Sequence, residues 1–541
     1  MTVQRRSLLL LLVAAGCRNT DAPSRGDAPQ VSSERLEQHI RYLASDRLAG
    51  RGTGTPGYDS AAQYVAQQFA RLGLDSAGTE GYFQPVPLRR ARAVEGSGLV
   101  LVGKAGRRAL APFRDYVPFP SQIAPRSEVT APLVFVGFGV TAPERSYDDY
   151  RDVDAKGKIV VLLTGAPAAF PPAERAHYAS GRTKRQNAVR QGAVGLLVVR
   201  TRDQTFPWDR LVRQSRRGEM RWLDSTGAPS DVSPALRGAG VLSDSAATRL
   251  FEGAPRPLRD VLAGAEAGKP PTFDLPLRAT MRTVSVHEPL ESRNVAGLLR
   301  GSDARLRDEV VVYTAHLDHL GIGEPVRGDS IYNGAMDNAS GSAALLEVAR
   351  AFATLPEAPR RSVLFLSVTG EEDGLLGSDY FAEHPTVPLE RIAANVNIDG
   401  LAILYPFRDI VALGAEHTTL DSTVARVARR MGVTVSPDPF PQEVFFVRSD
   451  QYSFVRRGVP SLFPFMGLRS DSGVDAPARF KEWLATRYHL PQDDVDQPMD
   501  LESGARNAQL EFLVGLEIAN AAERPAWKKG DFFERTFGRT R

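Results

Sequence analysis

Three apolar, β-branched segments in the C-terminal half of the chain each run into a cluster of acidic or imidazole side chains. Runs of this length and composition predict buried strands, and the clusters mark the points where the strands end. The segments are EVVVYTAHLDHLG at 309–321 with His316, Asp318 and His319, RSVLFLSVTGEEDG at 361–374 with Glu371 and Glu372, and ANVNIDG at 394–400 with Asp399.

A helix is predicted between the first two strands. The segment NASGSAALLEVARAFATL, residues 338–355, has apolar residues at helical spacing, so Asp337 directly precedes the helix. Strand, helix and strand of these lengths indicate a right-handed parallel crossover. Ligands of open parallel sheets gather beyond the carboxyl ends of the strands, so the charged clusters are expected to share one rim. The predicted fold class is α/β, with a mostly parallel sheet flanked by helices.

The charged residues suit divalent metal ions. Two imidazoles and three carboxylates are too many for one tetrahedral zinc with an open position, but they suit two metals if one carboxylate bridges them. Such a pair lies roughly 3.5–4 Å apart and holds a water or hydroxide between its ions. The candidate ligands are His316, Asp337, Glu372, Asp399 and His489.

Two further carboxylates fit supporting roles around these ligands. A carboxylate outside the ligand set must take the proton of the attacking water, and Glu371, which directly precedes Glu372, suits that role. Asp318 follows His316 by two residues and can accept the other ring N–H of that histidine, which would fix its tautomer.

The motifs TAHLDHLG, NGAMDNASG, VTGEEDG, NVNIDG and YHLPQDD, in this order, resemble those of the co-catalytic zinc exopeptidases, a family that includes bacterial leucyl aminopeptidases and glutamate carboxypeptidases. The resemblance implies a three-layer fold with a mixed, mostly parallel sheet. It implies two Zn²⁺ ions per chain, a cis peptide bond after Asp337, and Glu371 as the general base. The implied zinc ligands are His316 and Asp399 for one ion, Glu372 and His489 for the other, and Asp337 as the bridge, with Asp318 behind them.

Two other residues near these motifs have open roles. The Tyr488 hydroxyl can stabilise the developing oxyanion, or the ring can simply pack with an exposed hydroxyl. His319 has no place in the implied ligand set and can be structural. Surface or packing positions are expected for the other histidines, which are His39, His177, His287, His384 and His417.

The N-terminal segment MTVQRRSLLLLLVAAGCRNTDAPSRG indicates export. Two arginines precede an apolar run that ends in small residues, which predicts a signal peptide over residues 1–16. Ala14-Ala15-Gly16-Cys17 resembles a bacterial lipobox, and Cys17 is the only cysteine of the chain. We therefore expect a lipid anchor on Cys17, a cell-envelope location and a flexible tether over residues 17–31. The alternatives are an ordinary secreted form and a short uncleaved anchor, although the apolar run is below the roughly 20 residues that span a membrane.

At 541 residues, the chain is expected to form two or three domains. Its 67 basic and 64 acidic residues nearly cancel, and no basic stripe appears, which argues against a nucleic-acid partner. Residues 32–127 and 273–541 are assigned to the catalytic domain. The β-rich interval 128–272 lacks the metal motifs and resembles a protease-associated domain inserted into it, which would cover the cleft, select substrates or act as a spacer.

Leu462, Phe463 and Phe465 predict an apolar wall in the substrate site. This composition bears on which end of a peptide is cleaved. Acidic-peptide carboxypeptidases of the family tend to have arginines in that neighbourhood, so their absence favours an aminopeptidase for apolar N-terminal residues. A carboxypeptidase or dipeptidase remains an alternative, as does a glutaminyl cyclase of the same fold, a branch that uses a single zinc. An inactive, receptor-like binding protein is a further alternative.

Overall fold

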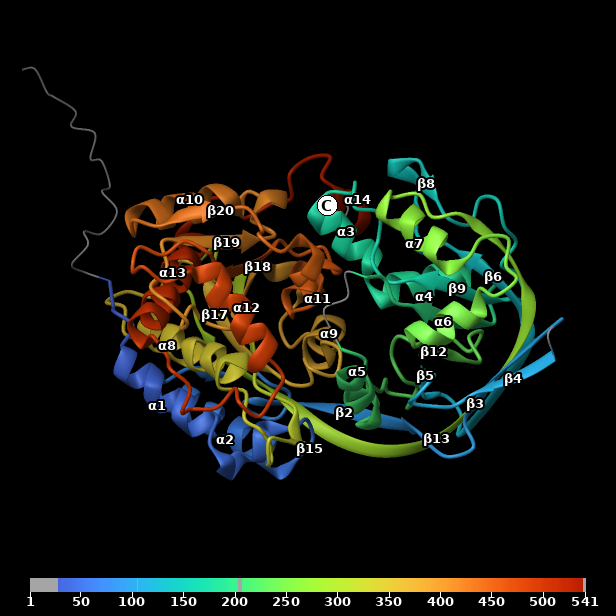
Figure 1. Ribbon diagram of the computed structural model, residues 1–541. Coiled ribbons are helices and arrows are strands. Elements are labelled where there is room, and N and C mark those ends of the chain that lie inside the picture. Colours follow the sequence, from blue (N-terminus) through green and yellow to red (C-terminus); the bar gives the residue numbers. More distant parts are fainter. Residues whose placement is uncertain (1–27, 105, 203–206, 539–541) are drawn as a thin grey trace, which may run out of the picture.

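The computed structural model describes residues 28–104, 106–202 and 207–538, which form two lobes joined by one long strand, β13 (Thr272–Leu299) (Figure 1). In Figure 1 the lobe on the left contains the metal motifs, and the lobe on the right contains most of the interval 128–272. The predicted α/β class is confirmed, because the fold has a large mixed, mostly parallel sheet flanked by helices.

The left-hand lobe is built on a sheet whose central strands are parallel. The first two predicted strands are parallel neighbours connected through α8, and the third pairs in parallel with the first. At the margins, β13 is antiparallel to β17, and β21 is antiparallel to β19. The strand order is β13, β17 (Ser362–Val368), β14 (Val310–His316), β18 (Ile392–Asn397), β21 (Ser461–Met466), β19 (Asp409–Leu413) and β20 (Thr434–Ser436).

Side-chain alternation along the strands divides the core of this lobe into two layers. Tyr313 of β14 packs with Phe352 of α8, whereas Val312 belongs to a separate cluster with Phe381 and Phe454. Helices therefore cover both faces of the sheet. The helices on the Tyr313 side are α1 (Ser33–Leu43), α2 (Pro56–Arg71), α8 (Gly341–Ala353), α10 (Leu420–Arg430) and α13 (Leu501–Asn520), and those on the Val312 side are α9 (Leu376–Glu383) and α11 (Gln451–Val455).

The right-hand lobe is β-rich and has its own sheet. Its strands are β3 (Gly98–Gly103), β4 (Gly106–Leu110), β5 (Tyr116–Pro118), β6 (Arg126–Val136), β9 (Ile159–Leu163), β10 (Gly195–Val199), β12 (Ala239–Leu242) and the first part of β13. Its helices include α4 (Gly181–Arg190), α6 (Asp244–Leu250) and α7 (Leu258–Glu266). Strands β3 to β5 precede residue 128, and the domain boundaries and the protease-associated assignment stay predictions.

Several elements connect the two lobes. The second part of β13 pairs along its length with β2 (Phe83–Ala93), and β2 pairs in turn with β11 (Glu219–Trp222). α5 (Trp208–Arg216) lies between the lobes in Figure 1. At the opposite side, α3 (Pro172–Ala179) approaches α11 and α14 (Phe532–Phe537). The right-hand lobe is therefore held against the left-hand lobe at more than one place. After the prediction from sequence, they are called the inserted lobe and the catalytic lobe below.

Among the described residues, no helix combines the length and the apolarity that a membrane crossing requires. The predicted signal peptide, residues 1–16, and Cys17 lie outside the described residues.

Candidate metal centre

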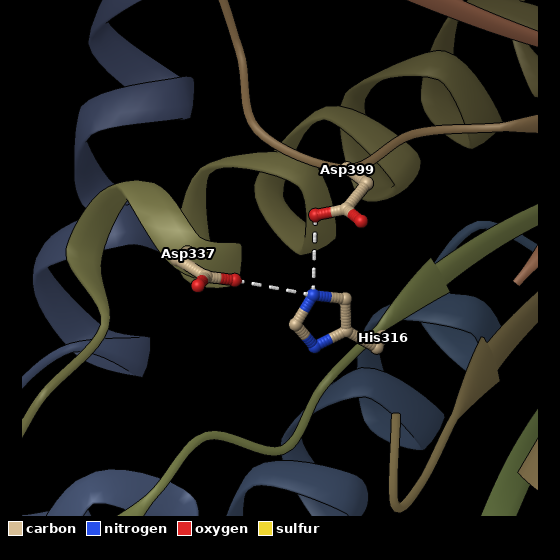
Figure 2. Close-up of side chains that lie close together, drawn as sticks. All are labelled: His316, Asp337 and Asp399. Atoms are coloured by element: carbon tan, nitrogen blue, oxygen red, sulfur yellow. Dashed lines mark hydrogen bonds and ion pairs between the residues drawn. The ribbon is translucent and has the colours of Figure 1, made fainter. Parts of the chain in front are cut away.

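One half of the candidate centre is formed at the ends of β14 and β18. His316 is the last residue of β14, and Asp399 follows β18 by two residues. The Nε2 atom of His316 lies 3.2 Å from Asp399 Oδ1 and 3.3 Å from Asp337 Oδ1 (Figure 2). The imidazole is buried, so its polar atoms face these carboxylates rather than water.

The other half is formed by a loop that follows α12 (Ala476–Thr486). His489 Nε2 lies 3.2 Å from Asp337 Oδ2 and 3.1 Å from Glu372 Oε2. Asp337 therefore turns one carboxylate oxygen to each histidine. All five candidate ligands meet in one place, and the peptide bond between Asp337 and Asn338 is cis, as the family resemblance implies.

His319 also belongs to this cluster, although it has no place in the ligand set that the resemblance implies. Its Nδ1 atom lies 2.6 Å from Glu372 Oε1, and the side chain is fully buried. The potential ligand atoms of His319, Asp337 and Glu372 all lie within 4.8 Å of one another. His319 therefore contacts the outer oxygen of Glu372 while His489 faces the other.

The charge balance of the cluster fits a bound cation. Burial alone would lower the pKa of His489, but the carboxylates of Glu372 and Asp337 raise it to about 9. Burial likewise opposes protonation of His316, yet Asp399 and Glu371 raise its pKa well above the ordinary value. A field that favours an imidazolium also favours a metal ion, and buried carboxylates require such compensation. The donor set of imidazole nitrogens and carboxylate oxygens suits zinc.

Asp318 supports the centre in a different way from the one predicted. The Nδ1 atom of His316 is 3.1 Å from the Asp318 backbone carbonyl, whereas the Asp318 carboxylate lies 3.9 Å away. That carboxylate instead accepts the backbone N–H groups of Glu371 and Glu372, at 3.1 and 3.3 Å. The backbone carbonyl of Asp318 thus faces the ring, and its side chain faces the residues that follow β17. Burial raises the pKa of Asp318 to about 7.

Two residues that the sequence did not single out hold the loops of the centre. Arg51 is fully buried and donates to the carbonyls of Leu317, Asn333 and Gly334 at 2.8, 2.7 and 3.0 Å. Asp493 accepts the backbone N–H groups of Met336 and Asp337, both at 3.0 Å. In the sequence, Arg51 stands in a Gly-rich loop and Asp493 in an acidic segment after His489. Neither pattern indicates which backbone groups these side chains bind. Met336, which directly precedes Asp337, is buried in the core and also lines the cavity described next.

A cavity opens beside the centre, and its lining is largely aromatic. Phe463 and Phe465 line it as predicted, but Leu462 does not, because alternate residues of β21 point to opposite faces and Leu462 is buried in the core. The lining also includes Glu371, Asp399, Phe445, Arg448, Phe480, Trp483, Tyr488 and His489. A molecule that enters this cavity meets both an apolar wall and the carboxylates of Asp337, Glu371 and Asp399.

Glu371 and Tyr488 both reach this cavity. Burial, with Asp399, Glu372 and Asp450 nearby, raises the pKa of Glu371 well above the ordinary value, although His316 opposes the change. Tyr488 accepts a hydrogen bond from Arg448 at 3.2 Å, and its ring lies against that of His489. Because the Tyr488 oxygen accepts this hydrogen bond, its own hydroxyl proton can be donated to another group. The structure also places a cation, Arg448, in the lining, where the sequence analysis predicts an apolar wall.

Together, the fold and the cluster define a metallopeptidase-like domain of the α/β class. Residues 294–513 match the family model described as Peptidase family M28. The chain therefore contains a peptidase family M28 domain, and this domain includes all five candidate ligands.

Named relatives agree with this assignment. The chain is 26% identical over 428 residues to Aminopeptidase NAALADL1 of Mus musculus, a match that covers 68% of this chain and 53% of the mouse protein. It is 25% identical over 516 residues to the Probable lipoprotein aminopeptidase LpqL of Mycobacterium tuberculosis, covering 90% of this chain and 85% of that protein. A Probable zinc metalloprotease of Pyrenophora teres f. teres is 32% identical over 248 residues, or 44% of this chain and 50% of that protein.

A solved structure shares the fold over nearly the whole length. The aminopeptidase from Aneurinibacillus sp. strain AM-1 superposes with a TM-score of 0.55 at 20% identity, covering 93% of this chain and 97% of that chain. At this level of identity the likeness establishes the fold, including the presence of both lobes.

Proposed function

We propose that this protein is a zinc-dependent aminopeptidase that removes apolar N-terminal residues from peptides. The observation that carries the proposal is Asp337, whose two carboxylate oxygens face different histidines at 3.3 and 3.2 Å. A single carboxylate placed between two nitrogen ligands is the arrangement that a pair of metal ions requires. The family domain and the names of the relatives support the same class of chemistry.

Each half of the centre would hold one zinc. His316 and Asp399 would bind one ion, Glu372 and His489 the other, and Asp337 both. When zinc is bound there, the site gains a Lewis acid that polarises the scissile carbonyl and lowers the pKa of water. His319, at 2.6 Å from Glu372, would hold the outer oxygen of that ligand.

The protein's own groups would move the protons. Glu371 lies in the cavity with a pKa raised chiefly by burial, so it can take a proton from the attacking water and give it to the leaving amine. The Asp318 carboxylate holds the Glu371 N–H at 3.1 Å and so fixes the start of this segment. Tyr488 accepts from Arg448, which leaves its own O–H to donate to the developing oxyanion.

The cavity suggests which residue is removed. Phe463, Phe465 and Trp483 would contact the side chain of the N-terminal residue, while the carboxylates beside them would attract its ammonium group. Arg448 is the feature that favours a second candidate function, a carboxypeptidase, because a guanidinium in the lining can pair with a substrate carboxylate. Its charge is partly balanced, since it donates to the Glu443 carbonyl at 3.2 Å and lies 3.8 Å from the Glu443 carboxylate.

A panel of blocked and free substrates separates these two functions. We expect release of p-nitroaniline from leucyl and phenylalanyl p-nitroanilides, little from the aspartyl compound, and none after N-acetylation. An Arg448→Gln variant should still act on leucyl p-nitroanilide. Cleavage of N-blocked peptides with a free C-terminus, abolished by Arg448→Gln, would refute the aminopeptidase assignment and support the carboxypeptidase.

We also propose export and lipid attachment at Cys17. The lipobox-like segment supports this location, and so does the similarity to a relative named as a lipoprotein. A Cys17→Ser variant of the full chain should leave the membrane fraction and appear in the soluble fraction. Membrane retention of that variant would contradict lipid attachment.

A further inference from the structure

The inserted lobe reaches the candidate metal centre through α5. Gln214 of this helix places its amide Nε2 at 3.3 Å from Nδ1 of His489. Four residues earlier, Arg210 donates a hydrogen bond to the backbone carbonyl of Tyr488 and lies over the Tyr488 ring, with its Cζ 5.7 Å from the ring centroid. One helix of the inserted lobe thus contacts two consecutive residues of the loop that carries His489.

The orientation of His489 gives the Gln214 contact a chemical meaning. Its Nε2 atom points at Asp337 and Glu372, so Nε2 is the nitrogen that would bind zinc. The imidazole must then be neutral with its proton on Nδ1, and metal-binding histidines commonly donate this proton to an oxygen. A half-turn of the Gln214 amide exchanges its nitrogen for its oxygen at the same place, so Gln214 can accept that proton.

The loop itself needs an external support. His489 has a φ of 55°, in the left-handed region that a residue with a Cβ seldom adopts. Contacts on both sides, from Asp337 and Glu372 at Nε2 and from α5 at Nδ1 and at the preceding carbonyl, can hold the ring in this conformation.

We propose that α5 of the inserted lobe completes the His489 half of the zinc site, with Gln214 as a positioning residue that accepts the Nδ1 proton of His489. The inference rests on the proposed function, because it requires His489 to bind zinc. It gives the inserted lobe a role in metal binding in addition to any effect on substrate access. Zinc bound at this half then depends on a residue from outside the catalytic sheet.

The test measures zinc affinity rather than turnover. Full-length apoprotein is titrated with zinc in competition with a chromophoric chelator, for wild type, Gln214→Leu, Gln214→Glu and the control Gln191→Leu. Gln191 is exposed in the inserted lobe, follows α4, and makes the same Gln→Leu change away from the centre. Gln214→Leu should weaken one of two zinc sites by roughly 10- to 100-fold and leave the other unchanged. Gln214→Glu, which keeps an acceptor oxygen, should retain the wild-type affinity.

Several outcomes would overturn the proposal. Wild-type affinity at both sites in Gln214→Leu would show that the contact does not support zinc binding. Equal weakening in Gln214→Leu and Gln214→Glu, or in Gln191→Leu, would show that the accepting oxygen is not the cause. A wild-type protein that binds one zinc would contradict the two-zinc site as well, whereas failure confined to the Gln214 variants leaves the proposed function standing.

Discussion

The two halves of the metal centre differ in what supports them. In the His316 half, the His316 side chain is 1% exposed. The contacts behind the ligands come from the catalytic lobe: the Asp318 carbonyl accepts from His316, and the Ser449 hydroxyl donates to Asp399 at 2.6 Å. In the other half, His489 is 10% exposed, lies on a loop, and contacts Gln214 of the inserted lobe. The core fold alone can therefore build one half, whereas the second half is assembled across the two lobes.

The bridging carboxylate offers the strongest test of this comparison. Asp337→Ala removes the group that both halves share, so we expect loss of both zinc ions and loss of measurable turnover. Elemental analysis after gel filtration would give the zinc content, and circular dichroism would check the fold. A variant that keeps one full equivalent of zinc would show that one half binds metal without the bridge.

Glu371 belongs to neither half and should separate chemistry from metal binding. In Glu371→Gln the amide cannot carry the proton of the attacking water, so turnover should fall by roughly 10²- to 10⁴-fold. The zinc content at saturating zinc should stay at the wild-type level, because Glu371 is not among the residues that face the two histidine Nε2 atoms. Unchanged turnover, or loss of zinc, would contradict its assignment as the base.

The part of the site that could be predicted from sequence follows from local patterns. His316, Glu372 and Asp399 end or follow strands that continuous apolar runs predict, and parallel strands bring such ends to one edge. Asp337 could be placed because it precedes a helix that apolar residues at helical spacing predict. His489 has no strand before it, and only the family resemblance connected it to the others.

The supporting contacts could not be predicted, because they join residues far apart in the chain. Gln214 and His489 are separated by 275 positions, and Arg51 and Leu317 by 266. Such contacts depend on how loops and lobes pack, which neither residue type nor periodicity encodes. The same limit explains Asp318, whose carboxylate was expected at His316 but lies at the amides of Glu371 and Glu372.

A pair of arginine substitutions tests the unequal support of the two halves. Arg51→Met would leave three loop carbonyls beside the His316 half without their buried donor, and we expect unfolding to become easier by roughly 3–5 kcal/mol. Arg210→Met removes a partly exposed donor to the Tyr488 carbonyl, which should cost only about 1 kcal/mol. Urea unfolding measures both, with the exposed Arg47→Met as the control for Arg51→Met. Equal effects of the two substitutions would contradict the difference between the halves.

A last test concerns acid and the contact between the lobes at α3. His177 of the inserted lobe contacts Tyr452 Oη of α11 at 2.6 Å, and its ring packs against Phe532 and Phe537 of α14. Burial, aided by Arg190, lowers the pKa of His177 from 6.5 to about 4. Between these values the unfolded chain binds more protons than the folded one, so stability is full above pH 6.5 and falls as the pH drops towards 4.

A His177→Phe variant keeps an aromatic ring at this contact but cannot be protonated. We expect its midpoint of thermal unfolding to decline less than that of the wild type between pH 6.5 and 4.5, although at pH 7 it lacks the hydrogen bond to Tyr452. Parallel pH profiles for the two proteins would show that His177 protonation does not oppose folding. If the profiles converge in acid, the α3 contact is an acid-sensitive connection between the lobes, whereas the Asp318 and Ser449 contacts of the His316 half lie within the catalytic lobe.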